Sequence, residues 1–258
     1  MDLTGGYKAF AAIICVTDVE LWAVQRMFDW KPYSIDGDEQ IYYEAFYTRE
    51  DGQIRIVAAK QDEMGMTAAA ALSMKMIYEF RPKYLIMAGI AAGMGEATID
   101  GQMYGDVVLA SSVWNCSNGK YVSPNQADIV FGDVGFISRP SQIEMDEGMI
   151  KKYKEILETV ETGCYVHVGP LASGACVVAN KSVLNKQVRD IIQDTKALEM
   201  EGYGVAYAAK CAGEPRPMPI IAKSICDFAD NQKDDKYQKF AAYTSCEIVR
   251  YMIKHVLE

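Results

Sequence analysis

Continuous apolar runs along the chain predict strands that are buried on both faces. Three such runs cover residues 10–16, 84–88 and 219–225, and two further strand candidates cover residues 105–110 and 166–173. Parallel strands covered by helices on both sides have this composition, whereas strands with one face in water alternate apolar and polar residues. We therefore expect these segments to form the inner part of a sheet.

Apolar residues spaced three and four apart predict the helices that cover this sheet. These helices are expected at residues 17–27, 145–161 and 237–257. Two further helices are expected at residues 65–78, which are rich in Ala and Met, and at residues 181–195, which are of mixed charge. Alternating residues on both sides of an Asp51-Gly52 turn predict an antiparallel hairpin at residues 40–48 and 53–59. Together these elements predict an α/β fold, a three-layer α/β/α arrangement around a mixed, twisted sheet.

Three segments depart from these patterns. Residues 89–93, Gly-Ile-Ala-Ala-Gly, follow an inner strand directly and are expected to form a loop that a ligand or a neighbouring strand can approach closely. Residues 111–139 are polar and lack a clear period, which is typical of an active-site lid or a binding loop. Residues 1–7 are expected to be a flexible lead-in or linker, which leaves one domain over residues 8–258.

Composition and charge exclude several classes of protein. The chain has 258 residues, half of them hydrophobic, so it can bury a large core. A net charge of -9 without a clustered basic face argues against nucleic acid as a partner. The apolar runs are too short to span a membrane, and the seven cysteines form no CxxC pair. We expect a cytoplasmic protein with reduced thiols, no metal site and no membrane partner.

Carboxylates stand where several predicted strands end. Asp227 closes the run at residues 219–225, Glu20 lies in the first helical turn after the first strand, and Glu199 and Glu201 lie at the start of another helix. Open α/β sheets bind ligands at the carboxyl ends of their strands, so these groups are expected at one edge. Taken singly, Glu199 and Glu201 also suit first-turn acids, and Asp227 also suits a helix cap.

Several short motifs occur along the chain in an order that is found in a known family. They are Ile13-Ile14 with Glu20, Gly89–Gly93, Tyr104–Val108, Ala172–Gly174, Glu199–Glu201 and Ile225–Asp230. In this order and spacing the chain resembles the nucleoside phosphorylase superfamily, and within it the methylthioadenosine/S-adenosylhomocysteine nucleosidases. The part from Ser173 to Gln238 also resembles nucleosidase-type effector domains of some multidomain immune-receptor proteins.

The resemblance implies a division of roles in cleaving a purine N-glycosidic bond. Asp227 would be the acid that protonates N7 of the base, which requires a carboxyl that holds a proton in a water-poor pocket. Glu20 would orient and deprotonate the attacking water. Glu201 and the backbone of Met200 would bind the ribose hydroxyls, and Lys223 would be a partner of the acid.

The resemblance also implies the positions that bind substrate. They are Ile90, Ala91, Gly93, Cys176, Val177, Val178, Glu199, Met200, Glu201 and Tyr237. Ile90 stands where the nucleosidases usually have Ser, and Val177 and Val178 stand where Phe and Ile commonly enclose the base. Adenine remains the expected base, bound through the backbone of residues 176–178.

Local charge favours hydrolysis over phosphorolysis. A phosphorylase needs Arg or Lys beside the reacting carbon, and the place of the family's Gly-Asp-Pro-x-Arg turn holds Val16 to Glu20. Arg26 and Lys60 are the cations that could reverse this preference. No cofactor is expected, apart from phosphate if the domain is a phosphorylase. Phosphorolysis of a purine or pyrimidine nucleoside, and a catalytically silent ligand-sensing domain, remain alternatives.

The resemblance also leads us to expect which residues surround the 5′ side of the substrate, and which oligomer the chain forms. Tyr237 would border the 5′ pocket, and four lysines near it or able to fold over it would admit AMP or ATP, namely Lys120, Lys233, Lys236 and Lys239. The same segment holds Asp230, Asp234 and Asp235, so a solvated turn of mixed charge is the alternative. A homo-oligomer, first of all a dimer, is expected from large apolar side chains near Trp114 and Phe131.

Overall fold

The three long apolar runs lie in the middle of a ten-stranded mixed sheet. The computed structural model describes residues 4–95, 101–127, 129–159, 164–229 and 235–258. The strands of this sheet are β1 (Ala9–Cys15), β2 (Lys31–Tyr33), β3 (Tyr42–Arg49), β4 (Gly52–Lys60), β5 (Pro82–Gly93), β6 (Val107–Asn115), β10 (Ser141–Glu144), β11 (Val166–Ser173), β12 (Ala197–Glu199) and β13 (Met218–Asp227).

Five strands of the sheet close into a ring. The strand β13 pairs with β5 and with β6, β6 pairs with β11, β11 with β12, and β12 returns to β5. Four further strands extend the sheet from β5 in the order β1, β4, β3, β2, and β10 pairs with β6 on the other side. Because β1 and β13 both run parallel to β5, their carboxyl ends lie at one edge. This edge is where an α/β sheet binds ligands.

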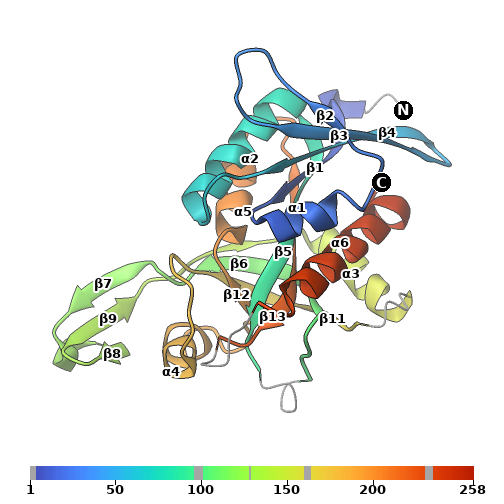
Figure 1. The fold of residues 1–258 in the computed structure, drawn as a ribbon. Coiled ribbons are helices and arrows are strands. Elements are labelled where there is room, and N and C mark those ends of the chain that lie inside the picture. Colours follow the sequence, from blue (N-terminus) through green and yellow to red (C-terminus); the bar gives the residue numbers. More distant parts are fainter. Residues whose placement is uncertain (1–3, 96–100, 128, 160–163, 230–234) are drawn as a thin grey trace.

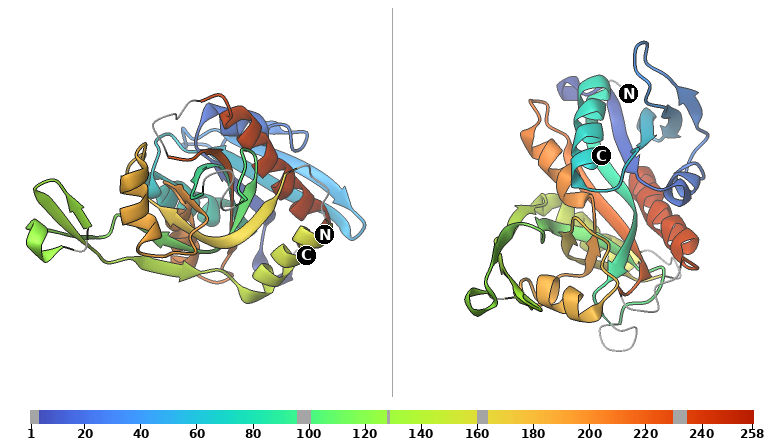
Figure 2. Two further views of the ribbon diagram at one scale, coloured as in Figure 1. Left: turned by 90° about the horizontal axis from the view of Figure 1, so that it is seen from below. Right: turned by 60° about the vertical axis from the view of Figure 1, so that its left-hand side comes forward.

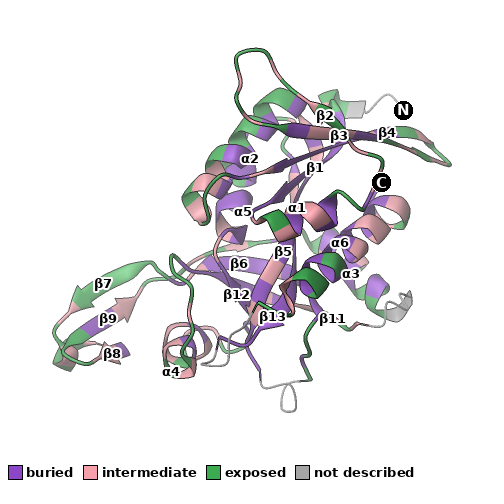
Figure 3. Cartoon of the chain, in the orientation of Figure 1, coloured by how far each residue is buried: buried purple, intermediate pink, exposed green. Residues whose placement is uncertain are grey.

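Helices cover both faces of the sheet, as Figure 1 and Figure 2 show. They are α1 (Asp18–Val24), α2 (Met66–Phe80), α3 (Glu147–Thr159), α4 (Lys181–Leu184), α5 (Gly202–Cys211) and α6 (Gln238–His255). On one face α2 and α5 bury Met76 and Val205, and on the other α1, α3 and α6 bury Val24, Tyr153 and Ile248. The strands between them are buried along most of their length (Figure 3). The expected three-layer α/β/α fold is confirmed.

Two predicted elements have different boundaries in the structure. Residues 89–93 are not a loop, because β5 continues to Gly93 and pairs there with β12 and β13. Residues 181–195 do not form one helix. After α4 the chain widens into a π-helix at Asn185–Arg189, which places both Leu184 and Val188 in a small core around Trp114.

The segment at residues 111–139 contains strands, so its interpretation as an irregular lid was wrong. Its first residues belong to β6, and β7 (Gly119–Val122), β8 (Ile129–Phe131) and β9 (Val134–Ser138) form a separate antiparallel sheet. A 3₁₀ turn at Pro124–Gln126 precedes β8. This sheet, which we call the arm, projects from the domain in Figure 1 and Figure 2. Strands of three to five residues are too short to show alternation in the sequence.

The described part of the predicted lead-in packs against the domain. Residues Thr4–Gly6 form a 3₁₀ turn. The Gly6 carbonyl accepts a hydrogen bond from Arg81 Nε at 3.1 Å, and the Tyr7 hydroxyl donates to the carbonyl of Arg216 at 3.0 Å. These contacts connect the start of the chain to the ends of α2 and of the loop before β13.

The close packing of α2 on α5 depends on Gly204. A Cβ atom at this position would lie 2.2 Å from the Met66 carbonyl oxygen, which is backbone and cannot turn away. We expect Gly204→Ala to lower the free energy of unfolding by about 1–3 kcal/mol, although alanine is the better helix former. Gly213→Ala is the control, since a Cβ there meets no atom within 4 Å. Equal denaturant midpoints for the two variants would contradict this account.

Candidate active site

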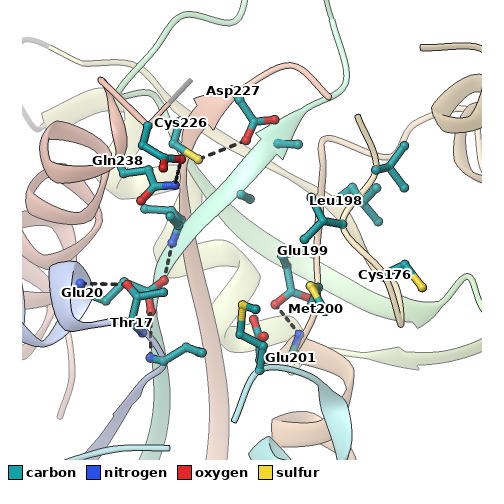
Figure 4. A pocket seen from close by; sticks show the side chains of 18 residues that line it. Thr17, Glu20, Cys176, Leu198, Glu199, Met200, Glu201, Cys226, Asp227 and Gln238 are labelled. Carbon is teal, nitrogen blue, oxygen red and sulfur yellow. Dashed lines mark hydrogen bonds between the residues drawn. The ribbon is translucent and has the colours of Figure 1, made fainter. Parts of the chain in front are cut away.

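A pocket of about 320 Å³ opens at the carboxyl ends of β1, β5 and β13 (Figure 4). Its lining consists of Val16, Thr17, Glu20, Met64, Ile90, Ala91, Ala92, Cys176, Val177, Val178, Leu198, Glu199, Met200, Glu201, Cys226, Asp227, Asp235 and Gln238. Most of the predicted site residues are in this set, although they come from distant parts of the sequence. The exceptions are Gly93, Tyr237 and Lys223.

Glu20 is held rigidly at the start of α1. Its Oε2 accepts hydrogen bonds from the backbone N–H groups of Val16 at 2.7 Å and Thr17 at 2.9 Å, and its Oε1 accepts from that of Ile90 at 2.8 Å. The Thr17 hydroxyl accepts from the Glu20 N–H and completes a capping box. The side chain is therefore buried with its carboxylate fixed between β1 and β5.

Gly89 provides the space for this carboxylate. A Cβ at position 89 would lie 2.1 Å from Glu20 Oε1 and 3.0 Å from Lys223 Nζ, so no larger residue fits. Small residues here are expected to allow the close approach of a ligand or of a neighbouring strand. In the structure, Glu20 and Lys223 are the groups that approach.

Lys223 lies at the centre of a buried charge cluster. Its ammonium is 3.3 Å from Glu201 and 3.4 Å from Glu199, and all three side chains are almost fully buried. Burial alone lowers the pKa of Lys223, but the negative charges of Glu201, Glu199 and Glu20 outweigh it and raise that pKa above its ordinary value. These contacts do not include Asp227, so a role of Lys223 as partner of that acid stays a prediction. Its ion pairs are with the two glutamates beside α5.

Most contacts of the Glu199 side chain are with the start of α5 and with Ser173. It accepts hydrogen bonds from the N–H groups of Glu201 and Gly202 at the start of α5, and from the Ser173 hydroxyl at 2.5 Å. Burial raises the pKa of Glu199, whereas Lys223 opposes that increase. The alternative interpretation of Glu199 as an acid favoured at a helix start accounts for these contacts.

Glu201 is placed differently, although it is only two residues away. Its Oε1 accepts a hydrogen bond from the Gly65 N–H at 3.0 Å, and its Oε2 accepts one from Lys223 at 3.3 Å. Gly65 lies in the connection between β4 and α2, next to the exposed Met64. Glu201 thus connects three segments while lining the pocket beside Met200.

Asp227 approaches the pocket from the end of β13. Its Oδ1 accepts a hydrogen bond from the Ala229 N–H at 2.8 Å, and the Cys226 thiol lies 3.5 Å from its Oδ2. The alternative in which Asp227 caps the next helix does not hold, because α6 begins only at Gln238. Figure 4 shows that Asp227 and Glu20 reach the pocket from different elements.

The side of the pocket next to α6 differs from the prediction. Tyr237 does not line it, because its ring stacks on Tyr104 with centroids 4.0 Å apart, and Asp235 and Gln238 line the pocket instead. Gly93 is also outside the lining, where its missing side chain leaves room for Phe228. A residue before a helix can point to either side, so the sequence offers no signal that selects Gln238 over Tyr237.

The lysines expected near the 5′ side have other contacts. Lys236 lies over the ring of Tyr237 at 5.2 Å, and Lys239 lies over Trp22 at 4.3 Å. Lys120 is on β7 of the arm. Lys233, Asp230 and Asp234 lie outside the described residues.

The described lining is acidic. It contains five carboxylates, Glu20, Glu199, Glu201, Asp227 and Asp235, and neither Lys nor Arg. Such a lining repels an anion and favours neutral molecules, or groups that donate hydrogen bonds. Within the described ranges, no three His, Cys, Asp or Glu side chains are arranged to hold a metal ion.

The chain is similar to proteins of one known family. The sequence matches the Phosphorylase superfamily over residues 10–258. The ATP nucleosidase Cap17 of Escherichia coli strain KTE188 is 23% identical over 94% of this chain and 50% of its own length. A 5′-methylthioadenosine/S-adenosylhomocysteine nucleosidase of Bacillus velezensis is 27% identical over 84% of this chain and 89% of its own. The relatives named here are thus nucleosidases, the class expected from the motifs.

Solved structures share the fold. The crystal structure of a 5′-methylthioadenosine/S-adenosylhomocysteine nucleosidase from Neisseria meningitidis, in complex with methylthio-immucillin-A, aligns with a TM-score of 0.75 at 23% identity, over 96% of this chain and 99% of that one. The chain spans only about half the length of Cap17 and 61% of a curated Sinorhizobium fredii protein. The family resemblance is confirmed: the chain belongs to the phosphorylase superfamily.

Proposed function

We propose that this domain is a nucleosidase that hydrolyses the N-glycosidic bond of an adenine nucleoside and releases the free base. The observation that carries this proposal is the placement of Asp227 and Glu20, two buried carboxylates from different strand ends, in one acidic pocket with Glu201. An acid for the leaving base and a base for the nucleophile are what glycoside hydrolysis requires. The nucleosidases among the relatives support the same reaction class.

Each carboxylate is held in place by contacts around the pocket. Asp227, next to the Cys226 thiol, would give a proton to N7 of the purine as the bond to the sugar lengthens. Glu20 would accept a proton from the attacking water, and three backbone N–H groups fix its orientation for this. Glu201, held by Gly65 and Lys223, would accept hydrogen bonds from the ribose hydroxyls. The base would lie against Val177 and Val178.

The charge of the pocket supports water as the nucleophile. A phosphate dianion would meet Glu20 at the position of attack, and the described lining offers no cation to offset that repulsion. Lys60 forms an ion pair with Asp18 at 2.9 Å, and Arg26 lies over Trp22 at 4.0 Å. Neither of the two cations that could have favoured phosphorolysis lines the pocket, and no phosphate or other cofactor enters the proposed reaction.

Asp227→Asn is expected to lower turnover by about 10²- to 10⁴-fold, because the amide keeps the shape of the side chain but cannot supply the proton. Glu20→Gln is expected to lower hydrolysis over a similar range. The measurement is release of free adenine from purine nucleosides, followed by chromatography. Binding of the nucleoside by Asp227→Asn, measured by calorimetry, serves as the folding control. Near-normal turnover of either variant would remove that residue from the proposed mechanism, and binding without any release by the unmodified protein would indicate a ligand sensor.

The 5′ substituent is the open part of the substrate. The relatives include an ATP nucleosidase and methylthioadenosine/S-adenosylhomocysteine nucleosidases. Asp235, at the α6 side of the pocket, and the engagement of Lys236 and Lys239 with aromatic rings favour an uncharged substituent over a 5′-phosphate. We therefore place methylthioadenosine or adenosine first, and AMP or ATP second.

A competition between methylthioadenosine and ATP at fixed ionic strength tests this order. We expect methylthioadenosine to be cleaved preferentially, with the same rate in the presence and absence of phosphate. Asp235→Asn should raise the relative turnover of ATP by about tenfold or less, the range of a single charge contact near the surface. Asp62→Asn is the charge-matched control, since Asp62 lines a different cavity and is not among the residues of the pocket. Preference for ATP by the unmodified protein would reverse the assignment.

We also propose a homodimer in which a second copy covers the open side of the pocket. Of the two residues that mark the predicted apolar segments, Trp114 has a fully buried side chain in the structure and Phe131 is partly buried. Tyr78 on α2 and Tyr207 on α5 are exposed instead, and Met64 and Val177 of the pocket lining are exposed as well. Large apolar groups gathered on neighbouring elements suit an interface between copies.

Light scattering at micromolar concentration is expected to give twice the monomer mass. Tyr78→Glu should shift the protein toward monomer, since it would bury a charge in the interface, whereas Tyr121→Glu on the arm should not. A monomeric unmodified protein would contradict the proposal.

The proposed compartment is the cytoplasm. All seven cysteines are free thiols, which supports a reducing environment. None of the helices in the described ranges has the length and apolar content to cross a bilayer.

A further inference from the structure

The segment before β6, Tyr104-Gly105-Asp106, packs against two residues that are next to pocket-lining residues in the sequence. The ring of Tyr104 stacks on Tyr237, with centroids 4.0 Å apart and planes 13° from parallel. The same ring meets Phe228 edge to face, at 5.2 Å and 71°. Phe228 directly follows Asp227, and Tyr237 directly precedes Gln238, which lines the pocket.

Backbone hydrogen bonds fix this segment against β13. The Gly105 N–H donates to the Ile225 carbonyl at 2.9 Å, and the Ile225 N–H donates to the Asp106 carbonyl at 2.9 Å. Ile225 is two residues before Asp227. Gly105 has a φ of 90°, and a Cβ there would lie 2.2 Å from the ring of Phe240 on α6. The segment therefore has little freedom to move relative to either β13 or α6.

The carboxylate of Asp106 anchors the segment on its other side. It accepts hydrogen bonds from the N–H groups of Met103 at 2.8 Å and Tyr165 at 3.0 Å, and it lies 2.9 Å from His167 Nε2. The side chain of Asp106 is buried, so water does not compete for these contacts. A ring attached to so rigid a support can fix the position of whatever it touches.

We propose that Tyr104 is a positioning residue of the active site. It acts through Phe228 on the acid Asp227, and through Tyr237 on Gln238 and Asp235. Tyr237 contributes as the partner of this stack and is not part of the described pocket lining. This inference rests on the proposed nucleosidase function, since its effect is measured on that reaction.

The stacked pair of Tyr104 and Tyr237 sets the size of the expected change in rate. An aromatic pair contributes enough beyond simple burial to change a rate by about threefold to tenfold when the contact serves the transition state. If the two rings act as a unit, removing either ring causes this loss and removing both causes no more. If each ring acts alone, the two losses multiply.

The test is a double-mutant cycle on kcat and KM for adenine release from a purine nucleoside. We expect Tyr104→Leu and Tyr237→Leu each to lower kcat by about threefold to tenfold, with KM changed by less than about twofold. The double variant should match the weaker single variant. Tyr104→Phe and Tyr237→Phe should keep nearly full activity, because phenylalanine preserves the stacked ring.

Two controls separate positioning from general stability. Tyr121→Leu removes an exposed tyrosine of the arm that packs only against Phe136 among the ring contacts described, and it should leave kcat unchanged. Thermal unfolding of each variant shows that the assays are made on folded protein. Multiplying losses in the double variant, Phe variants as impaired as Leu variants, or an effect confined to KM would each overturn the proposal. Absence of turnover in the unmodified protein would instead reject the proposed function.

Discussion

The arrangement of the pocket depends on the buried ion pairs that the ammonium of Lys223 forms with Glu199 and Glu201. A charged group without water must be compensated by close opposite charge, and removing one partner of such a cluster costs about 3–5 kcal/mol in proteins generally. Here the compensation comes from Glu199 and Glu201, with Glu20 nearby. One lysine on β13 therefore fixes the start of α5, and Gly89 on β5 leaves the space in which Glu20 approaches it.

The division of work between the two neighbouring glutamates follows from this cluster. Glu199 accepts hydrogen bonds from the N–H groups at the start of α5 and from the Ser173 hydroxyl, so it stabilises the N-terminal end of that helix. Glu201 is held from two sides by Gly65 and Lys223 and remains at the pocket surface. A substrate that binds Glu201 would thus be linked, through the Gly65 hydrogen bond, to the segment between β4 and α2. The exposed Met64 of that segment borders the same pocket.

The sequence predicts the parts of this site that follow from chain direction alone. A continuous apolar run ending in Asp227, and a capping residue three positions before Glu20, place both carboxylates at strand ends without knowledge of the fold. Contacts between distant residues decide the rest. Ser173 and Gly65 lie 26 and 136 residues from the glutamates they bind, and no local pattern distinguishes Glu199 from Glu201. Tyr237 was misplaced for the same reason, since its orientation depends on Tyr104.

The ring of five strands has a consequence for how the protein is made. The strand β13, late in the chain, fills the gap between β5 and β6, which are complete much earlier. During synthesis on the ribosome, these two earlier strands keep unpaired backbone edges until β13 leaves the exit tunnel. Open edges of apolar strands are sites of mispairing with other chains. The nascent domain is therefore most exposed to aggregation, and most in need of a chaperone, just before the strand that carries Asp227 arrives.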